Sequence, residues 1–437
     1  MEILLYLGGV VFMLIGLGLS IGLHEVGHLL PAKLFGVRVG QYMIGFGPRL
    51  WSRRIGETEY GFKALPLGGF ISMSGMYPPS SKSSPARGVF ASLVQDARTA
   101  NDETIGAGDE DRVFYRLPVW KRVIIMLGGP AMNFLLAIAI FTVMASGIGI
   151  QQASTTVSSV TECVLPAGTT QQTCTADDPA APAAEAGIQA GDVLVSVDGE
   201  KVQTFAEASA IIQRSPGEPL AVVVDRGGKD VELTLTPVAA ERGEVDAEGR
   251  PVVDDDGDPV TRTVGYAGIF SQQEYVPQPI GTGAELAVQQ TQAVASLVIN
   301  LPAKLWDVGV SLVTGSERDP NGPLSVVGVG RLAGEVAATD APVLNRLVVL
   351  MNLLAALNIA LFVFNLIPLL PLDGGHIVVA LWEGVKRAWA KLTGRRAPRP
   401  VDATRLVPVT VIVAVLLIGM GALLIVADLV KPMNLLG

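Results

Sequence analysis

Charged residues are scarce in this chain of 437 residues: Asp, Glu, Lys and Arg make up 17% of it, against 49% hydrophobic residues. Soluble globular proteins usually carry about a quarter charged residues, so this balance excludes an ordinary soluble protein and favours a membrane protein. Basic residues are also in deficit, with 32 Lys and Arg against 41 Asp and Glu. The sequence therefore predicts no nucleic-acid partner.

Cysteine and histidine are rarer still, with two and three residues in the whole chain. Two cysteines exclude a scaffold built on several disulfides. Cys163 and Cys174 are either two unrelated free thiols or one local disulfide, and a location outside the cytoplasm favours the disulfide. With so few histidines, any spacing among them that suits a metal is informative.

Long hydrophobic runs are abundant instead. Four windows have the roughly 20 apolar residues that are needed to cross about 30 Å of hydrocarbon, and none of them contains Lys, Arg, Asp or Glu. The first is not expected to be a cleaved signal peptide, because no basic residue precedes Lys33 and no small-residue cleavage site follows the run. The predicted spans are Ile3–Leu23, Val123–Ile150, Leu347–Leu372 and Leu406–Ala427.

The distribution of charge predicts the orientation of these spans. Residues 31–122 carry 13 Lys and Arg against 8 Asp and Glu, whereas residues 151–345 carry 10 against 27. Residues 373–404 are again basic, with 6 against 3. Because basic connections stay in the cytoplasm, the first and third connections are expected there, and the acidic middle region and both termini are expected outside.

The connections differ in their patterns. Residues 40–76 contain glycine-rich turns beside short alternating segments, which predicts a small β-hairpin or sheet at the membrane face. Residues 78–112 are rich in Ser, Pro, Ala and Asp and are expected to be a flexible cytoplasmic insert. Residues 283–315 and 322–337 have apolar positions at helical spacing but are too interrupted for spans, so we expect helices on the outer membrane face.

The acidic middle region contains a strand, turn and helix pattern that resembles a PDZ domain. The stretch "AGIQAGDVLVSVDG" is typical of the bacterial kind, and "GYAGI" resembles the loop that binds a peptide carboxylate. This loop follows the other elements, so the resemblance implies a circularly permuted PDZ domain that binds a peptide as an added strand; the alternative is a spacer without a ligand. The acidic run Glu241–Asp258 is expected to be a solvated loop. The candidate peptide-binding residues are Gly265, Tyr266, Ala267, Gly268 and Ile269.

The sequence "HEVGH" at the end of the first span carries the chemistry. On a helix, His24 and His28 project from one face one turn apart, which suits two neutral imidazoles on Zn²⁺, and Glu25 lies beside them where a general base is needed. The alternative is a solvated pair of histidines at a helix end. The predicted topology brings "NLIPLLPLDGGH", with Asp373 and the third histidine, His376, to the same depth at the end of the third span.

In their order along the chain, "HEVGH", "GFGP", "PLGGF", "GGPAMN", the PDZ-like pattern and "NLIPLLPLDGGH" resemble the site-2 proteases, zinc metalloproteases that cut within membranes. The resemblance implies that His24, His28 and Asp373 bind zinc and that Glu25 is catalytic. It also implies that Asn365 handles the substrate strand. Because imidazole is the better intrinsic zinc donor, His376 remains the alternative third ligand.

The fold class expected is a polytopic α-helical membrane protein with four transmembrane helices, a membrane-associated β-hairpin or sheet and an extracytoplasmic PDZ-like α+β domain. The expected segments are 1–30 with the zinc motif, 31–122 as the cytoplasmic β region, 123–150, 178–270 as the PDZ-like domain, 271–345 as outer helices, 346–376 with the LDG motif, and 405–428.

The function expected is intramembrane endopeptidase cleavage in a bacterial plasma membrane. The resemblance implies transmembrane protein substrates, such as anti-sigma factors already cut outside, with membrane lipid as the other partner. Three alternatives remain: removal of leftover signal peptides, an inactive PDZ membrane scaffold, and a metal transporter. The transporter is disfavoured because the spans have no charged residue at the midplane.

Overall fold

The computed structural model describes residues 1–78, 89–106, 108–164, 174, 180–243, 260–319, 322–396 and 400–432. It forms two compact units, which are described separately. One consists of Met1–Gly147 with Pro279–Gly437, and the other of Ile148–Gln278.

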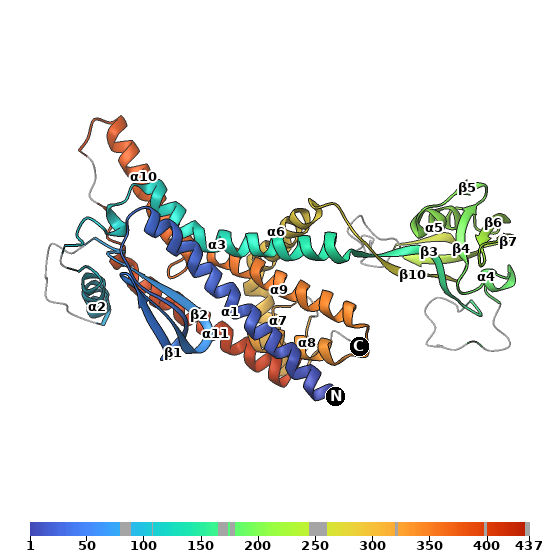
Figure 1. The fold of residues 1–437 in the computed structure, drawn as a ribbon, viewed down its shortest axis with the longest axis horizontal. Helices are drawn as coiled ribbons and strands as arrows, with labels where there is room; N and C mark the ends of the chain where they lie inside the picture. The colour runs from blue at the N-terminus through green and yellow to red at the C-terminus, as the bar shows by residue number, and fades with distance from the viewer. Residues whose placement is uncertain are drawn as a thin grey trace. The chain divides into compact units, whose positions relative to one another are not determined.

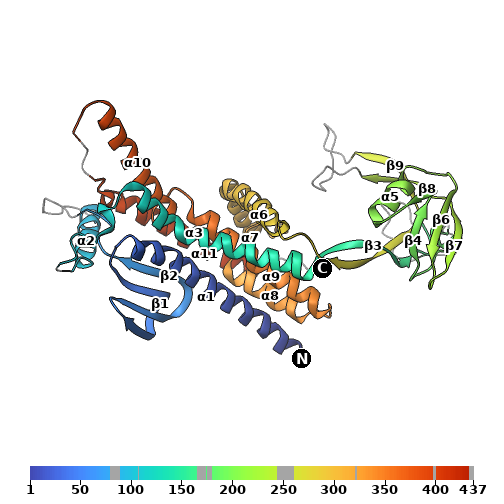
Figure 2. The ribbon, with the colours of Figure 1, turned by 45° about the horizontal axis from the view of Figure 1, so that its top comes forward.

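Among the described residues, four helices in the first unit are long and apolar enough to cross a membrane. The first three of them pack side by side, and the last packs against the helices that precede the third span (Figures 1 and 2). Many of their large apolar side chains remain exposed in the isolated chain, as expected for surfaces that face lipid. The structure thus agrees with the expected polytopic helical protein. The helices are α1 (Glu2–Leu34), α3 (Val119–Thr142, continued by a π-helical turn, Val143–Ile148), α9 (Val343–Asn365) and α11 (Val407–Val430, preceded by the 3-10 turn Ala403–Leu406).

The end of the third span differs from the prediction. The expected window reaches Leu372, but α9 ends at Asn365, and an irregular turn leads to a separate helix, α10 (Asp373–Leu392). Pro368 and Pro371 lie in this turn, and proline cannot donate the backbone hydrogen bonds that would continue α9. Asp373 is consequently the first residue of a helix. The predicted segment 346–376 had placed it near the end of a helix instead.

The connection between α1 and α3 begins with a curled two-stranded sheet of β1 (Val39–Ile55) and β2 (Thr58–Met73). The start of β1 pairs with the end of β2, with Val39 opposite Met73 and Ile44 opposite Gly69. The end of β1 pairs with the start of β2, beginning with Ile55 opposite Thr58. This agrees with the expected hairpin. The prediction of a wholly flexible insert over 78–112 is wrong, because residues Val89–Glu103 form α2; residues 79–88 and 107 lie outside the described part.

Helix α2 is followed by a short 3-10 turn, Phe114–Arg116, which leads into α3. Asn101 of α2 donates to the carbonyl of Tyr77 and accepts from its amide, each over 3.0 Å. Arg98 of the same helix pairs with Asp402 at 2.7 Å, just before α11. These polar contacts depend on residues far apart in the sequence, which explains why composition alone missed the helix.

The connection before α9 is helical, as expected. Helix α6 (Thr282–Ile299) is followed at once by α7 (Leu301–Thr314), and the two are bent by 66° at their junction. Helix α8 (Val326–Ala338) packs its Leu332, Ala333 and Val336 against Met13 of α1 and Leu350 of α9. Small residues permit this close packing, as a Cβ on Gly9 would lie 2.2 Å from the Ala333 carbonyl oxygen.

The second unit contains a six-stranded sheet and two helices around one apolar core. Its main path runs β10-β3-β4-β6-β7, with β5 beside β4, and β8 and β9 form a separate pair. The unit starts at Ile148, well before the expected 178, because β3 pairs with β10. Cys163 and Cys174 form a disulfide. The elements are β3 (Ile150–Val160), α4 (Pro182–Glu185), β4 (Val193–Val197), β5 (Glu200–Lys201), α5 (Phe205–Gln213), β6 (Leu220–Asp225), β7 (Asp230–Leu235), β8 (Val238–Gly243), β9 (Thr261–Tyr266) and β10 (Ile269–Val276).

The acidic run Glu241–Asp258 was expected to be a solvated loop. Its first residues, through Gly243, are exposed and belong to β8. Residues 244–259 lie outside the described part of the chain.

Candidate metal centre

Helix α1 places the two imidazoles of "HEVGH" on the side that faces α3. His28 is buried, and its Nδ1 donates to the carbonyl oxygen of Ile125 over 2.7 Å. This hydrogen bond fixes the proton on Nδ1 and leaves the Nε2 lone pair free for a metal. The Nε2 atoms of His24 and His28 are 3.2 Å apart. The helix thus orients both rings with their donor nitrogens converging.

Asn133 of α3 supports the ring of His24. Its side-chain amide lies 3.3 Å from His24 Nδ1 and is completely buried. As placed, its nitrogen faces the ring and Oδ1 has no hydrogen-bond partner among the described residues. Exchanging the amide oxygen and nitrogen would let Oδ1 accept from His24 Nδ1–H, which is the protonation state that a zinc-bound Nε2 requires. The sequence signal for this role was a polar amide inside an apolar run.

Glycines let α3 approach α1 closely enough to do this. A Cβ on Gly128 would lie 2.0 Å from the Gly27 carbonyl oxygen, and one on Gly129 would lie 2.2 Å from His28 Nε2. Both contacts are shorter than real Cβ atoms make. Gly128 is therefore required for the close crossing of α1 and α3, and Gly129 leaves room for the imidazole of His28. The sequence analysis did not assign these roles.

Asp373 reaches the imidazoles from the first turn of α10. Its Oδ2 lies 3.3 Å from His24 Nε2 and 3.4 Å from His28 Nε2. The turn before it is compact: a Cβ on Gly374 would lie 2.4 Å from the carbonyl oxygens of Leu366 and Ile367. Burial raises the pKa of the Asp373 carboxyl, but the two imidazoles outweigh this and hold the pKa below its usual range. The group is therefore ionised, as a zinc ligand must be.

The three donor atoms have the spacing of a zinc site. All lie within 4.8 Å of one another, and the distances of 3.2, 3.3 and 3.4 Å between them form a nearly equilateral triangle. Two ligand atoms at about 2.0–2.1 Å from a tetrahedral ion are about 3.3–3.4 Å apart. Apart from these imidazoles, Asp373 Oδ2 has no hydrogen-bond partner in the described part of the chain. Two histidines and a carboxylate also leave the fourth position open, as in catalytic zinc sites.

His376, the alternative ligand, is directed elsewhere. Its ring stacks on Tyr77 with the ring centroids 6.2 Å apart and an angle of 26° between the planes. Burial lowers its pKa, so the ring is neutral near pH 7. Among the described residues, the cluster that the structure brings together contains His24, His28 and Asp373 and not His376. Nothing in the sequence near Tyr77 indicated this stacking partner.

Glu25, next to His24 on α1, is buried and faces the sheet. A Cβ on Gly69 of β2 would lie 2.9 Å from Glu25 Cγ and 3.1 Å from its Oε1. The sheet is tied to the same part of α1 by Tyr42, whose hydroxyl donates to the Gly22 carbonyl over 2.7 Å. The backbone of β2 at Gly69 thus lies close to the candidate catalytic carboxylate.

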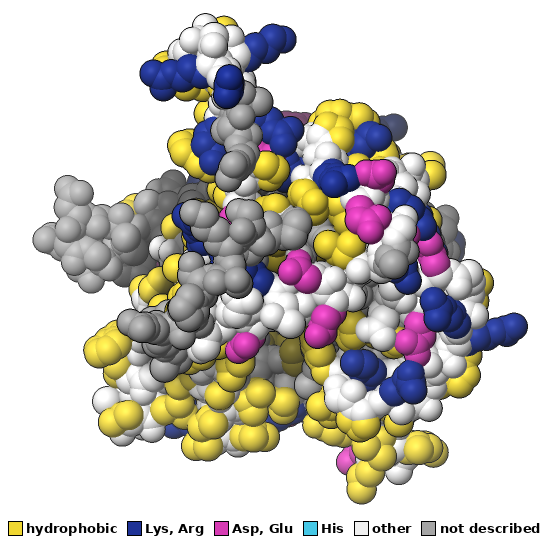
Figure 3. Space-filling view, turned by 90° about the vertical axis from the view of Figure 1, so that its left-hand side faces the viewer, with side chains coloured by type: hydrophobic (Ala, Val, Ile, Leu, Met, Phe, Trp, Pro, Cys, Tyr) yellow, Lys and Arg dark blue, Asp and Glu magenta, His cyan; other side chains and the backbone are white. Residues whose placement is uncertain are grey.

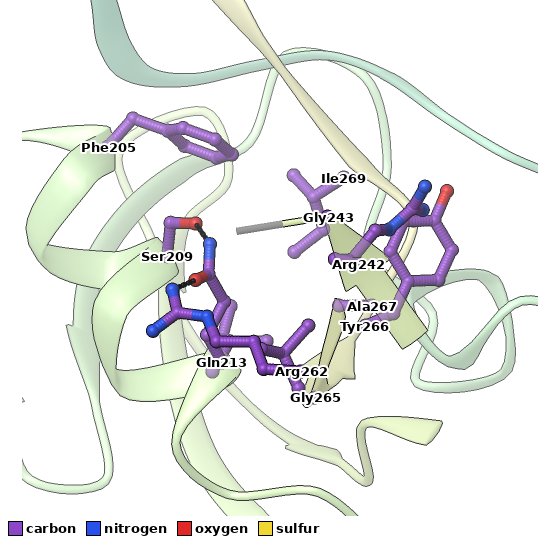
Figure 4. A pocket seen from close by; sticks show the side chains of 13 residues that line it. Phe205, Ser209, Gln213, Arg242, Gly243, Arg262, Gly265, Tyr266, Ala267 and Ile269 are labelled. Carbon is purple, nitrogen blue, oxygen red and sulfur yellow. Dashed lines mark hydrogen bonds between the residues drawn. The ribbon is translucent and has the colours of Figure 1, made fainter. Parts of the chain in front are cut away.

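Asn365 and the "GYAGI" residues lie outside this cluster. Asn365 ends α9 and donates to the Leu361 carbonyl over 2.9 Å. Gly265–Ile269 are in the second unit, where they line a cavity of about 370 Å³ with α5. Figure 4 shows Phe205, Ser209 and Gln213 of α5 on one side of it and Arg242, Tyr266 and Ile269 on the other. Arg242 lies over the ring of Tyr266 at 4.7 Å.

Known proteins similar to this chain share its length and this zinc chemistry. Residues 12–401 match the sequence model of peptidase family M50. The protein named zinc metalloprotease Rip1 from Mycobacterium tuberculosis (strain H37Rv) is 32% identical over 99% of this chain and its own full length. The Rip1 of Mycolicibacterium smegmatis is 34% identical over 98% of each chain. Metalloprotease MmpA of Caulobacter vibrioides is 28% identical over 86% of this chain and 87% of its own. This chain belongs to peptidase family M50, the site-2 proteases, and is a zinc metalloprotease of the membrane.

Proposed function

We propose that this protein is an intramembrane endopeptidase that cleaves transmembrane segments of other membrane proteins in regulated intramembrane proteolysis. His24, His28 and Asp373 hold the zinc ion, and Glu25 is the general base. The observation that carries the proposal is the triangle of three donor atoms, all within 4.8 Å of one another, two of them on the apolar helix α1 and the third on the first residue of α10. Ionisable groups at such a position are costly and mark a functional site.

The residues around the triangle divide the chemistry. When bound, zinc polarises the scissile carbonyl and lowers the pKa of a bound water. Glu25 accepts the proton of the attacking water and returns it to the leaving amine, because it is the carboxylate next to the ligands that is not itself spaced as one. Ile125 and Asn133 keep the imidazoles in the required orientation.

The site lies near one end of the spans, where water can reach it. His28 is seven residues from Phe35, the C-cap of α1, which corresponds to roughly 10 Å at a rise of about 1.5 Å per residue. The basic charge of the connections to which β1, β2 and α10 belong supports a cytoplasmic location for this end. The acidic second unit then lies outside the cytoplasm of a bacterial cell, where the disulfide Cys163–Cys174 is stable.

The edge of the sheet is suited to hold the substrate strand. A membrane helix must unwind before it can be cut, and its freed backbone groups need new partners. The segment Gly69–Met73 pairs on one side with Val39–Ile44, and Glu25 lies next to Gly69, where a Cβ would be only 2.9 Å from Glu25 Cγ. A substrate strand added at this edge would pass beside the general base. Asn365, the last residue of α9, precedes the irregular turn that leads to Asp373 and binds the same substrate strand.

The second unit is a PDZ-like domain that selects substrates. Its groove lies between α5 and the β8–β9 pair and ends at Ile269, the first residue of β10. Among the described strands β10 is an end strand of the six-stranded sheet, so a peptide can be added beside it. Arg242 and Arg262 line the groove and suit a newly exposed carboxyl terminus. Deleting the unit should permit cleavage of substrates with intact outer domains. If the deletion instead abolishes cleavage of short substrates, selection by this unit is wrong.

The substrates expected are anti-sigma factors already cut outside; leftover signal peptides are the second candidate class. A Glu25→Gln variant should lose turnover of a membrane-helix substrate by a factor of at least about 10² while keeping its zinc, since it loses a general base and no ligand. Zinc content by mass spectrometry and turnover in detergent are measured on the same sample. Substantial activity in the variant would contradict the role of Glu25 as general base, whereas no activity in a zinc-loaded wild type would leave the scaffold alternative standing.

A further inference from the structure

Helix α10 carries an apolar stripe that the rest of the chain does not cover. Six of its large apolar side chains are between 46% and 83% exposed. On a helix of about 3.6 residues per turn, their positions all fall within a stripe of about 100°. The six residues are Val378, Leu381, Trp382, Val385, Trp389 and Leu392.

The opposite side of α10 is anchored to the start of α3. Glu383 is fully buried and pairs with Arg122 of α3 at 3.0 Å. A Cβ on Gly384 would lie 3.4 Å from the Val119 side chain. These contacts place the middle of α10 level with the first turn of a predicted membrane span, Val119–Ile148.

The same level has the marks of a membrane–water interface. Trp120 follows Val119 and is 56% exposed. Its ring packs against Phe35, at the end of α1, with centroids 5.5 Å apart, and Lys121 lies over the Phe35 ring. Tryptophan beside lysine at the end of a span is typical of the headgroup region. The stripe of α10 therefore begins where hydrocarbon gives way to headgroups.

Basic residues border the stripe toward the end of the helix. Lys386 is half-buried beside it, and Lys391, Arg395 and Arg396 are exposed. Between α10's first residue, Asp373, and Arg396, the one other acidic side chain is Glu383, which is occupied by Arg122 and Arg387. Figure 3, which looks at this end of the molecule, shows Lys and Arg side chains gathered at the protruding end at the top; Figures 1 and 2 place the end of α10 there, outside the bundle.

We propose that α10 lies in the headgroup region of the membrane leaflet on the side of the zinc site and binds anionic lipids there. An exposed stripe with two tryptophans, bordered by several cations and no free acid, matches a negatively charged lipid surface better than a protein surface, where cations need specific partners. The identification of this leaflet as the cytoplasmic one rests on the proposed function. Because α10 begins with Asp373, the lipid surface would hold the helix that supplies the third zinc ligand.

The test uses the full chain in lipid nanodiscs and the fluorescence of Trp389. The other four of the five tryptophans are replaced by phenylalanine, and the Glu25→Gln background removes proteolysis. Nanodiscs contain phosphatidylcholine alone or with phosphatidylglycerol, and a fraction of the lipid carries bromine near the glycerol. We expect bromine to quench Trp389, acrylamide to quench it little, and phosphatidylglycerol to increase the bromine quenching.

Charge reversal identifies the lipid headgroup as the cause. The Lys386→Glu/Lys391→Glu variant should lose the increase with phosphatidylglycerol, whereas the control Lys201→Glu/Lys229→Glu, in the second unit, should keep it. Equal quenching in both bilayers overturns the binding of anionic lipid. Quenching by acrylamide alone shows a helix in water, and protection from both quenchers shows that a protein or a second copy covers the stripe; either result overturns the proposal. Since no cleavage is measured, a failure here leaves the protease assignment untouched.

Discussion

Each unit contains an aspartate that is largely shielded from solvent, and the surroundings of the two carboxylates are opposite. In the second unit, Asp192 receives Arg226 Nε at 2.7 Å on one oxygen, and Arg226 Nη2 and the Gln189 amide, both at 2.8 Å, on the other. In the first unit, the neighbours of Asp373 Oδ2 are two imidazole nitrogens at 3.3 and 3.4 Å. One carboxylate is fully hydrogen-bonded, while the other faces nitrogens that can also bind a metal.

This difference separates a structural from a functional carboxylate. Strong hydrogen bonds satisfy Asp192, and its bidentate partner locks the strand β4 to the end of β6. The Asp373 cluster is left with donor atoms at metal-ligand spacing, and no Lys or Arg of the described residues pairs with its carboxylate. A shielded carboxylate oxygen whose described polar neighbours are imidazole nitrogens is suited to share a metal ion with them.

The strongest way to break this comparison is to remove each aspartate. Asp373→Ala should abolish both stoichiometric zinc and proteolysis, because a third protein ligand is lost. Asp192→Ala should keep both and instead destabilise the second unit by about 1–3 kcal/mol, since Arg226 loses its partner. Zinc is measured by mass spectrometry, and the stability of the second unit by hydrogen exchange in the intact chain. Loss of zinc in the Asp192 variant would mean that the two carboxylates do not differ in kind.

The close approach of Gly129 to His28 allows a second test of the difference between the two aspartates, through the zinc-binding histidines. Gly129→Ala places a methyl group 2.2 Å from His28 Nε2, so the rings must shift, and zinc affinity should fall about 10–100-fold, as for other supporting residues around metals. The matched control is Gly18→Ala in α1, where a Cβ meets nothing within 4 Å. Competition with a chelator measures the affinity. Equal affinity in both variants would show that the imidazoles are not held where the structure places them.

The smallest expected effect is the pH dependence of the second unit. The hydrogen bonds from Arg226 hold the pKa of Asp192 below its usual range, whereas the unfolded value is about 3.9. A lowered folded pKa gives stability that is fully present above the unfolded value and is lost as the pH falls through the folded one. Hydrogen exchange between pH 6 and pH 3 should therefore show a larger loss in the wild type than in Asp192→Asn. An equal loss would assign the acid sensitivity to other carboxylates.

Local patterns were sufficient to predict the spans and the zinc motif. A span needs only apolar length, and the spacing of His24 and His28 is set by a single helix turn. The membrane class, the protease family and zinc are confirmed by the related proteins. The ligand set, the catalytic role of Glu25 and the PDZ-like assignment remain predictions, although the distances in the cluster are those that the ligand set requires.

The features that were missed depend on contacts between distant segments. Helix α2 is held by Tyr77 and Asp402, which lie 24 and 304 residues from their partners. Pro368 and Pro371 interrupt the helix locally, but the close packing of Gly374 and Gly375 against the turn Leu366–Leu372 depends on the folded structure. Likewise, the roles of Gly129 and Asn133 appear only once α3 crosses α1. Such information is absent from composition and periodicity.

The central claim, that two imidazoles and one carboxylate hold the zinc ion, is tested most directly by zinc K-edge X-ray absorption of the purified protein. Because the chain has three histidines, counting imidazoles decides between the two candidate ligands. The account predicts two imidazoles with the remaining ligands oxygen at about 2.0–2.2 Å, unchanged in His376→Ala. A spectrum with three imidazoles that falls to two in His376→Ala would contradict the account and assign the third ligand to His376.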